Sequence, residues 1–520
     1  MLLNFFLNEY LKIDPLYAVI ILDINTNNNI YTNYLSNEYL SKYKKLLIKY
    51  KKKTYNKKNL NDKLLYTICK NQLKLHKTKY YLFPLNSCDN LIIDFKEINE
   101  VYYKINNLND YNSLINRIKS FQIIIDTLKI RLLQGINKKL TISKFICNKI
   151  IKDLEYFINN KLYIINIDKK FYKYDYINII NKYYRDNIIK FIKFLKNTYL
   201  NKCKNSISMS KLPNGKHIYK SFILSNLSLN IKPKNIFKIG IDEVNRLQNE
   251  FIKIMNNTTN YNNLIEYFNY MLNNKKFKYE NNTQMYNHYI YMQKFINKNI
   301  INKFFYKKVK DYKIKFIDKE LENMRPAAYY YPVSKKENGI IYINEKLNKH
   351  KYNAFVLSLH EGIPGHHYQY KYMTDNNIPL SKIYTTFDTA YVEGWALYCE
   401  SLGNEFYNNE EYFGKLSFEI LRASRLVVDV GINYYNWSYK KAYNYMKNNI
   451  PLDDANIKNE LERYICSPGQ ALSYKIGELK IIEIRDKFIN NKHGNIKDFH
   501  KKILDSGVIT LNLLENFIIN

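Results

Sequence analysis

The chain has 520 residues, which allows one large domain or up to three smaller ones and excludes a peptide or a disulfide-stabilised miniprotein. Its 46% hydrophobic and 25% charged residues are ordinary for a globular protein and exclude disorder throughout the chain. The net charge of +34 would suit binding to nucleic acid. However, 72 of the 81 basic residues are Lys, and Lys, Asn, Ile and Tyr, which are all abundant, share A/T-rich codons. A solvated lysine-rich surface is therefore favoured over a site for nucleic acid.

Residues 1–205 are predicted to form long amphipathic helices. Apolar residues recur at i, i+3, i+4 and i+7 near 34–55, 110–135 and 175–200. Gly135 is the only glycine of this part, and so few helix breakers favour helices over many short strands. The turn residues of KLPNGKH at 211–217 indicate a boundary close by, so we expect a helical N-terminal part over 1–205 and a second part over 206–520.

The second part is also predicted to be helical, apart from one short β region. The helical pattern continues from 236 and covers 261–273 and 283–307. Three segments rich in β-branched and aromatic residues predict strands: YKIKFI (312–317), AAYYYPV (327–333) and GIIYIN (339–344). Helices are expected again after Lys351, so the predicted fold class is mainly α with a small β-sheet.

Several patterns bear on the location of the chain and on its partners. The six cysteines are scattered without a CxxC pair, which predicts reduced thiols and a cytoplasmic location. The N-terminal segment lacks a basic stretch and carries Glu9 and Asp14, unlike a signal peptide. No run of 18 apolar residues predicts a membrane span. The oligomeric state stays open.

Glycine and arginine, which are scarce in this chain, are concentrated between residues 325 and 485. Eight of the fourteen glycines lie between Gly362 and Gly477, and five of the nine arginines lie between Arg325 and Arg485. Glycine is required where backbones approach closely, and arginine where a carboxylate is held by two hydrogen bonds. We therefore expect the chemistry of the chain in this region.

Three of the nine histidines lie close together there, in LSLHEGIPGHHYQYKY. A zinc hydrolase needs two imidazoles that converge on one ion, and a carboxylate beside the first that accepts a proton from the water that the metal activates. His360 supplies the first imidazole and Glu361 the carboxylate. We therefore expect Glu361 to be the general base.

The second imidazole departs from the usual HExxH spacing. On a regular helix His366 would point about 120° away from His360, and His367 would return to the same face roughly 10 Å along the axis. The pair Pro364 and Gly365 relieves this conflict, because Pro interrupts a helix and Gly tolerates the distortion that follows. A local bulge of two residues favours His366 as the ligand, and His367 is kept as its rival.

A third ligand is found in VEGWALYCE, where Glu393 begins an apparent helix. Zinc in a catalytic site takes three protein ligands and keeps one position open. Glu400 lies two helical turns after Glu393 on the same face, where it would orient a ligand by a hydrogen bond. The predicted group is thus His360, His366 and Glu393 around Zn²⁺, although other divalent metals suit these ligands too.

Several segments resemble one known family, the domain-of-unknown-function family 885. They are HEGIPGHHYQ, VEGWALYCE and SPGQALSYKIGELKIIEIRDKF, and KLPNGKHIYK, GIDEVNRLQNEF and RPAAYYYP are similar to further family segments. The resemblance runs from about 211 to the end, and FLNEYLKIDPLYA is similar to the family opening. It implies a large zincin-like helical metallopeptidase architecture. VEGWALYCE also looks like the glutamate-ligand helix of gluzincin peptidases, which implies Glu393 as a zinc ligand.

Three residues are candidates for stabilising the oxyanion that forms during peptide hydrolysis, namely Arg463, Tyr464 and Tyr474. In related peptidases a tyrosine often has this role. Arg463 could equally bind the C-terminal carboxylate of a substrate, which would indicate a carboxypeptidase. Both readings stay open, as does the choice between exo- and endopeptidase action.

The segment GIIYIN is interpreted as an edge strand that pairs with an extended peptide, with Asn344 and Tyr330 beside the cleft. The sequence thus predicts a zinc-dependent metallopeptidase that acts on a peptide substrate, as a carboxypeptidase or an oligopeptidase. The alternatives are a metal-dependent hydrolase of another amide or ester, a metal-free inactive scaffold and, least favoured, a basic nucleic-acid-binding protein.

Overall fold

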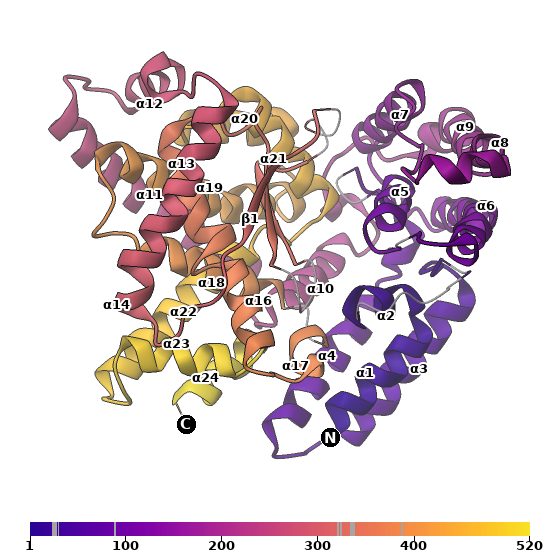
Figure 1. Cartoon of the computed structure of the whole chain (residues 1–520), viewed down its shortest axis with the longest axis horizontal. Coiled ribbons are helices and arrows are strands. Elements are labelled where there is room, and N and C mark those ends of the chain that lie inside the picture. Colours follow the sequence, from indigo (N-terminus) through magenta and orange to yellow (C-terminus); the bar gives the residue numbers. More distant parts are fainter. Residues whose placement is uncertain are drawn as a thin grey trace. The chain divides into compact units, whose positions relative to one another are not determined.

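The computed structural model describes residues 1–22, 29, 31–87, 90–103, 105–319, 322, 325–332, 338–385 and 388–519. Cys88 and Val333, which entered the predictions above, lie outside these residues. The described chain consists mainly of helices and has one small sheet, which confirms the predicted fold class at this level (Figure 1). It divides into two compact units, Met1–Ser221 with Ile465–Ser467, and Phe222–Tyr464 with Pro468–Asn520.

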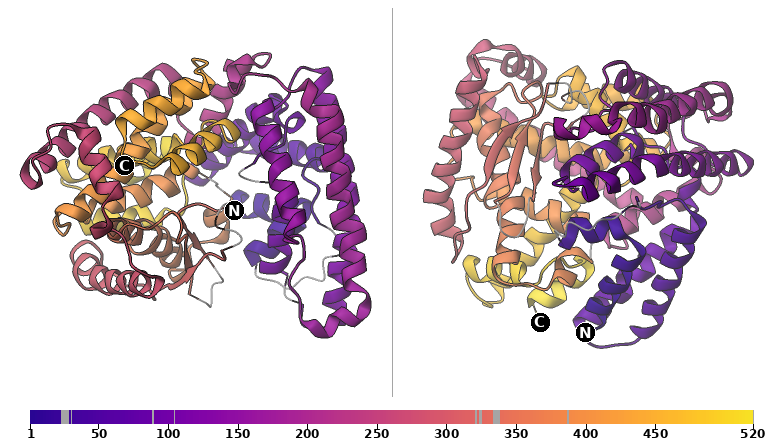
Figure 2. Two further views of the ribbon diagram at one scale, coloured as in Figure 1. Left: turned by 90° about the horizontal axis from the view of Figure 1, so that it is seen from above. Right: turned by 45° about the vertical axis from the view of Figure 1, so that its right-hand side comes forward.

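The described part of the first unit consists of helices and the loops between them and has no strand, as both views in Figure 2 show for the indigo and violet part of the chain. Its helices are α1 (Leu2–Ile13), α2 (Pro15–Leu22), α3 (Asn37–Lys53), α4 (Leu60–Lys77), α5 (Leu91–Val101), α6 (Leu108–Asn137), α7 (Lys144–Asn159), α8 (Tyr176–Ile180), α9 (Asp186–Phe194) and the beginning of α10 (Gly215–Leu227). The turn that was expected to mark the boundary near 205 directly precedes α10, and the compact units divide inside that helix.

Helix α6 illustrates why this unit folds as helices. The side chain of Asn107 caps the helix by accepting a hydrogen bond from the N–H of Asp110. Residues three and four apart, such as Leu114, Ile118 and Phe121, are fully buried along one side of the helix. The helical spacing of apolar residues therefore produces the face that builds the core.

The second unit holds the remaining helices and the sheet. The helices are α11 (Pro233–Thr258), α12 (Leu264–Asn273), α13 (Asn282–Ile296), α14 (Asn302–Phe304), α15 (Ala354–Leu357), α16 (His366–Asp375), α17 (Leu380–Tyr384), α18 (Thr389–Ser401), α19 (Asn409–Asn433), α20 (Tyr439–Asn449), α21 (Asp454–Cys466), α22 (Ser473–Asn490), α23 (Ile496–Asp505) and α24 (Leu511–Ile519). The chain after Lys351 is thus helical, as predicted.

The sheet has three strands, β1 (Lys313–Phe316), β2 (Ala328–Tyr331) and β3 (Ile340–Ile343), in the order β1-β3-β2. Strand β3 pairs in parallel with β1 and antiparallel with β2. The interpretation of GIIYIN as an edge strand is therefore wrong, because β3 is the central strand and has hydrogen-bonding neighbours on both sides. The edge strands are β1 and β2.

Helices α18 and α22 lie side by side and cross at two glycines (Figure 1). A Cβ atom on Gly394 would lie 2.4 Å from the carbonyl carbon of Gly477, and one on Gly477 would lie 2.0 Å from the carbonyl oxygen of Ala390. Both positions are closed to any side chain, so glycine lets the two backbones touch. The crossing fixes α18, which carries Glu393 and Glu400, against α22.

The substitution Gly477→Ala is expected to lower the free energy of unfolding by about 1–3 kcal/mol, because the added methyl group forces the two helices apart. The sign is informative, since alanine in an unconstrained helix would stabilise it by roughly 0.5–1 kcal/mol relative to glycine. Urea unfolding measures the change, with Glu483→Ala on the exposed side of α22 as the control. A Gly477→Ala protein as stable as the wild type would contradict the close crossing.

His500 on α23 is a fully buried histidine with both ring nitrogens in use. Its Nδ1–H donates to the carbonyl oxygen of Phe304 at 2.8 Å, and its Nε2 accepts from the hydroxyl of Tyr398 at 2.8 Å. The ring stacks on Phe305 with centroids 4.6 Å apart. Burial lowers the pKa of His500 to about 4, since a charged ring would be desolvated there.

This histidine predicts a loss of stability in acid. The unfolded chain binds a proton to His500 below its ordinary pKa of 6.5, whereas the folded chain does so only near 4. Stability from this group is therefore complete above pH 6.5 and falls as the pH drops towards 4, by about 3 kcal/mol in all. Unfolding of wild type and His500→Gln at pH 7.5 and 4 measures it, with His493→Gln at an exposed position as the control. Equal pH dependence in all three proteins would contradict the prediction.

Candidate metal centre

A break between two helices positions the two histidines of the predicted group. Helix α15 runs into a π-helical turn over Ser358–Gly362, the chain leaves the helix at Ile363 and Pro364, and α16 begins at His366. The expected bulge within one helix is therefore replaced by a helix end and a new helix start. Gly365 fits because a Cβ there would lie 1.9 Å from the carbonyl oxygen of His360.

The three predicted ligands converge. The Nε2 atoms of His360 and His366 lie 3.5 and 3.4 Å from Oε2 of Glu393, and all three ligating atoms lie within 4.8 Å of one another. The two rings are nearly perpendicular, with centroids 4.9 Å apart. Ligands about 2.0–2.1 Å from a tetrahedral zinc ion are roughly 3.3–3.4 Å apart, so the donor set and its spacing fit this metal.

The group is open on one side. The side chain of His360 is 4% exposed, whereas those of His366 and Glu393 are 13% and 18% exposed. His360 thus forms the floor of the group, and His366 and Glu393 form its accessible edge. This matches a site that keeps one position for a small molecule from solvent.

The charges of these residues favour a cation between them. Burial alone would raise the pKa of Glu393, but electrostatic attraction by His366 and hydrogen bonds with both histidines hold that pKa well below its usual value. Burial lowers the pKa of His360, yet Glu393 and Glu400 more than compensate and raise it to about 9. Protons on the imidazoles or a metal ion that displaces them would satisfy the carboxylate equally well.

Glu400 fixes the orientation of His360, as the sequence predicted for it. Its Oε1 accepts a hydrogen bond from Nδ1–H of His360 at 2.8 Å, which directs Nε2 towards Glu393. Arg422 of α19 lies behind this pair, with its guanidinium 3.7 Å from the same carboxylate oxygen. All three side chains are buried, so the orientation of His360 is set by residues from two other segments, α18 and α19.

Glu361 lies beside the group and is connected to the sheet. Its Oε2 accepts a hydrogen bond of 2.9 Å from the backbone N–H of Tyr330 in strand β2. The residue is 8% exposed. The contact holds one carboxylate oxygen in place and links the edge strand to the metal-binding turn.

These residues lie within a region, 31–518, that matches the family model described as "Bacterial protein of unknown function (DUF885)". The chain belongs to the DUF885 family. The match confirms the family resemblance seen in the sequence. No curated protein matches the chain.

Two solved structures share the fold of this DUF885 chain. The putative lipoprotein from Colwellia psychrerythraea is 20% identical, with a TM-score of 0.82 over 92% of this chain and 91% of its own. A putative lipoprotein of unknown function from Shewanella oneidensis is 16% identical, with a TM-score of 0.74 over 100% of this chain and 99% of its own. At these identities the likeness establishes the fold alone.

The predicted cytoplasmic location is wrong by this comparison. Both structural relatives are described as putative lipoproteins, which points to a membrane-anchored or exported location rather than the cytoplasm. The scattered cysteines on which the prediction depended do not distinguish the two locations. None of the described helices combines the length and the hydropathy that a membrane crossing requires.

His367 does not join the metal group of the DUF885 chain. Its Nε2–H donates to the carbonyl oxygen of Lys310 at 2.6 Å, and its ring packs edge-on against Tyr312 and Tyr330. The side chain is fully buried, and burial lowers its pKa to about 4. It is a neutral core histidine, so the alternative between His366 and His367 favours His366 on geometry.

Two other predicted site residues are used elsewhere. Asn344 is fully buried, and its amide holds the loop after β3 by accepting from the N–H of Lys346 and donating to the carbonyl of Arg325. Tyr464 is also fully buried, and its hydroxyl donates to Glu460 at 2.7 Å. Neither side chain is available to a substrate, which corrects both predicted roles.

Arg463 and Tyr474 lie together, and both are partly exposed. Nη2 of Arg463 donates to the hydroxyl of Tyr474 and to the side-chain oxygen of Gln470, both at 2.7 Å. Burial raises the pKa of Tyr474, Arg463 opposes this shift, and the carboxylate of Glu393 adds to it. Tyr474 therefore lies within electrostatic reach of the metal group. The side chain of Tyr330, the remaining predicted substrate contact, packs against His367, and it is the backbone of this residue that reaches the site.

Three residues around this site were not assigned from the sequence: Arg422, Arg425 and Glu460. The scarcity of arginine was the available signal, because both arginines lie in the 325–485 region that was expected to hold the chemistry. Their partners come from other helices and have no recognisable spacing.

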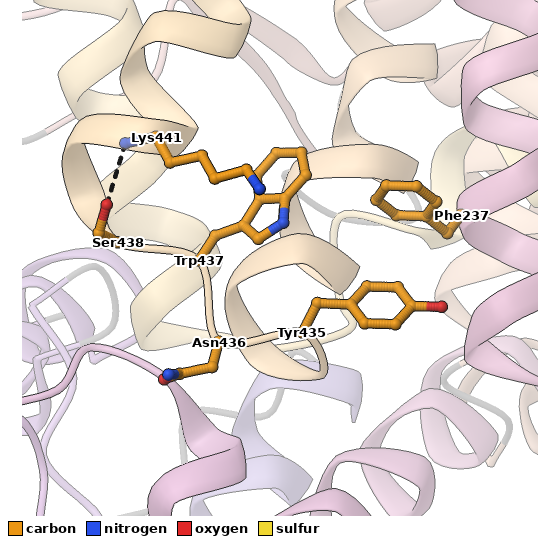
Figure 3. A pocket seen from close by; sticks show the side chains of 6 residues that line it. All are labelled: Phe237, Tyr435, Asn436, Trp437, Ser438 and Lys441. Carbon is orange, nitrogen blue, oxygen red and sulfur yellow. Dashed lines mark hydrogen bonds between the residues drawn. The ribbon is translucent and has the colours of Figure 1, made fainter.

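A separate surface pocket of about 650 Å³ is lined by Phe237, Tyr435, Asn436, Trp437, Ser438 and Lys441. Figure 3 shows the lysine chain running along the indole of Trp437, and Nζ of Lys441 lies 4.7 Å from the ring centroid. No ligand of the candidate metal group lines this pocket. The amino group of Lys441 already lies over the aromatic ring of Trp437. We therefore expect the chemistry of the chain at the metal group and not in this pocket.

Proposed function

We propose that the chain is a zinc-dependent metallopeptidase with a zincin-like site, held by His360, His366 and Glu393. The observation that carries the proposal is the spacing of these three ligating atoms. Glu361 follows His360 in the chain, and its carboxylate contributes to raising the pKa of that histidine. A zinc ion bound there would polarise a carbonyl oxygen and acidify a water molecule. A metal-free scaffold would not need the hydrogen bond to Glu400 that holds His360 in one orientation.

Glu361 is the proposed general base. Its carboxylate accepts the proton of the water that attacks the scissile carbonyl, and it then delivers this proton to the leaving amine. The hydrogen bond from Tyr330 occupies Oε2 and leaves Oε1 for this exchange. The fixed carboxylate is therefore ready for proton transfer without rearrangement.

Tyr474 is the proposed donor to the oxyanion. Because arginine has only donors, the hydroxyl oxygen of Tyr474 must accept from Arg463, which leaves the proton of Tyr474 free to be donated. The carboxylate of Glu393 contributes to raising the pKa of Tyr474, which supports a place for the phenol near the metal group. A donor at this place stabilises negative charge as it develops on the carbonyl oxygen.

The sheet supports a peptide as the substrate. The N–H of Asn344 donates to the carbonyl of Ala327, and with the register of β2 and β3 this directs the backbone groups of Ala328 and Tyr330 away from β3. The N–H of Tyr330 reaches Glu361 on that side. An extended peptide that adds to β2 would therefore run past the general base.

Hydrolysis of a mixture of unstructured peptides by the zinc-loaded protein tests this proposal, with cleavage positions read by mass spectrometry. We expect zinc-dependent cleavage of peptide bonds that a chelator abolishes. Simple esters and non-peptide amides are assayed in parallel. Cleavage of those compounds alone would replace the peptidase by another metal-dependent hydrolase, and a zinc-replete protein that cleaves nothing would contradict the proposal.

A further inference from the structure

Helix α22, which carries Tyr474, packs against α18, which carries Glu393, and the two backbones touch at Gly477 and Gly394. Arg463 of α21, Gln470 in the turn before α22 and Tyr474 of α22 are all partly exposed. They are joined by two hydrogen bonds from Nη2 of Arg463. His366 and Glu393 are the partly exposed members of the metal group. Arg463 and Gln470 therefore lie around the tyrosine of the helix that packs against the helix of Glu393.

Arg463 is the accessible member of a buried arginine cluster. Its side chain is 25% exposed, whereas those of Arg422 and Arg425 are 7% and 5% exposed. The guanidinium groups of Arg425 and Arg463 lie 4.4 and 5.1 Å from the ring centroid of Tyr474. The cluster therefore lies directly around the proposed oxyanion donor.

The cluster carries more positive than negative charge. Its three arginines are paired with two carboxylates, those of Glu400 and Glu460. Both carboxylate oxygens of Glu460 accept hydrogen bonds from Arg425, at 2.9 and 3.0 Å. Oε1 of Glu460 also lies 3.5 Å from Nη1 of Arg463. Nε of Arg422 and Nη1 of Arg425 are buried without a hydrogen-bond partner in the described residues. The unmatched charge is poorly screened, because its surroundings exclude water.

We infer that Arg463, supported by Arg425 and Gln470, binds a carboxylate of the substrate, and that this carboxylate is the C-terminal one of a peptide. The inference rests on the proposed peptidase function. A guanidinium group forms paired hydrogen bonds with a planar carboxylate, and the amide of Gln470 adds a donor. Tyr474 accepts a hydrogen bond from Arg463 and lies one helical turn from the point where α22 touches the helix of Glu393, so the bound carboxylate would lie near the bond that is cleaved. The enzyme would then release residues from the C-terminus.

Three matched sets of random N-acetylated tripeptides test this inference on the zinc-loaded full chain: free C-terminal acids, the same peptides as C-terminal amides, and amides that carry Asp or Glu in the last position. We expect kcat/KM to be about 10- to 100-fold higher for the free acids than for either amide set. The variant Arg463→Gln is expected to lose this preference, mainly through a higher KM for the acids. Any loss of kcat that arises because Tyr474 loses its hydrogen bond from Arg463 should affect acids and amides alike. Arg485→Gln, which removes another partly exposed arginine, serves as the control.

Binding provides a readout that does not depend on turnover or on the variants. Calorimetry on the metal-free wild-type chain is expected to give tighter binding of the free acids than of the amides. Equal cleavage and equal binding of acids and amides would overturn the inference while leaving the peptidase proposal intact. Equal treatment of free acids and acidic amides would overturn the assignment to the C-terminal carboxylate. Absence of all cleavage would contradict the proposed function, and acid-selective binding would then still support the subsite.

Discussion

Replacing Glu361 by Gln is expected to lower kcat/KM for peptide hydrolysis by about 10²- to 10⁴-fold, because the amide cannot accept the proton of the attacking water. Glutamine keeps an oxygen that can accept the N–H of Tyr330, so the local structure should persist. Glu361 is not among the three ligating residues, and zinc affinity should therefore change little. Steady-state kinetics and zinc titration on the same preparation measure both quantities.

The control for this variant is Glu405→Gln, which changes an exposed carboxylate whose side chain is 64% exposed. It should keep wild-type turnover. A Glu361→Gln protein that cleaves peptides at the wild-type rate would exclude Glu361 as the general base. A Glu361→Gln protein that has lost zinc would instead place this carboxylate among the ligands.

Replacing Glu400 by Ala is expected to weaken zinc binding by about 10- to 100-fold, although Glu400 is not a ligand. The carboxylate accepts Nδ1–H of His360 at 2.8 Å and thereby holds the ring with Nε2 towards the metal position. Without it, His360 loses its orientation and Arg422 loses its carboxylate partner. Competition with a chromophoric chelator measures the dissociation constant.

The double variant Glu400→Ala with Arg422→Met separates the two effects of this change. It removes the uncompensated guanidinium group and should recover part of the stability lost by Glu400→Ala, but none of the zinc affinity. Unaltered zinc affinity in Glu400→Ala would show that the orientation of His360 does not depend on this carboxylate.

Local patterns in the sequence predicted the helices and the strands, because the spacing and the type of the residues within one segment favour one kind of element. The buried residues of α6 recur at helical spacing, and the segments that became β1, β2 and β3 are rich in β-branched and aromatic residues. Strand order was not predictable in this way. The central place of β3 depends on parallel pairing with β1 and antiparallel pairing with β2, which no local pattern encodes.

The part of the site that contains scarce residue types was predictable from the sequence. Histidines are few in a chain dominated by Lys, Asn, Ile and Tyr, so His360 and His366 with a downstream Glu393 stood out. The role of His367 was not decidable from spacing, because it depends on the break of the helix at Pro364 and on the carbonyl of Lys310.

Contacts between distant segments escaped prediction for the same reason. Arg422 reaches Glu400 from α19, and Arg425 pairs with Glu460 of α21. Tyr464 and Asn344 were proposed for the site from their position in the sequence, and both proved to be fully buried. Burial results from how helices pack, and sequence position alone does not report it.

The zinc content of the purified chain, measured by mass spectrometry for wild type beside Glu393→Ala, tests the central claim most directly. The site described here predicts about one zinc per wild-type chain and most of it lost in the variant, because Glu393 is the only carboxylate among the three ligating residues of the described chain. Wild-type protein that binds no zinc even when zinc is supplied would contradict the metal centre and the peptidase proposed from it.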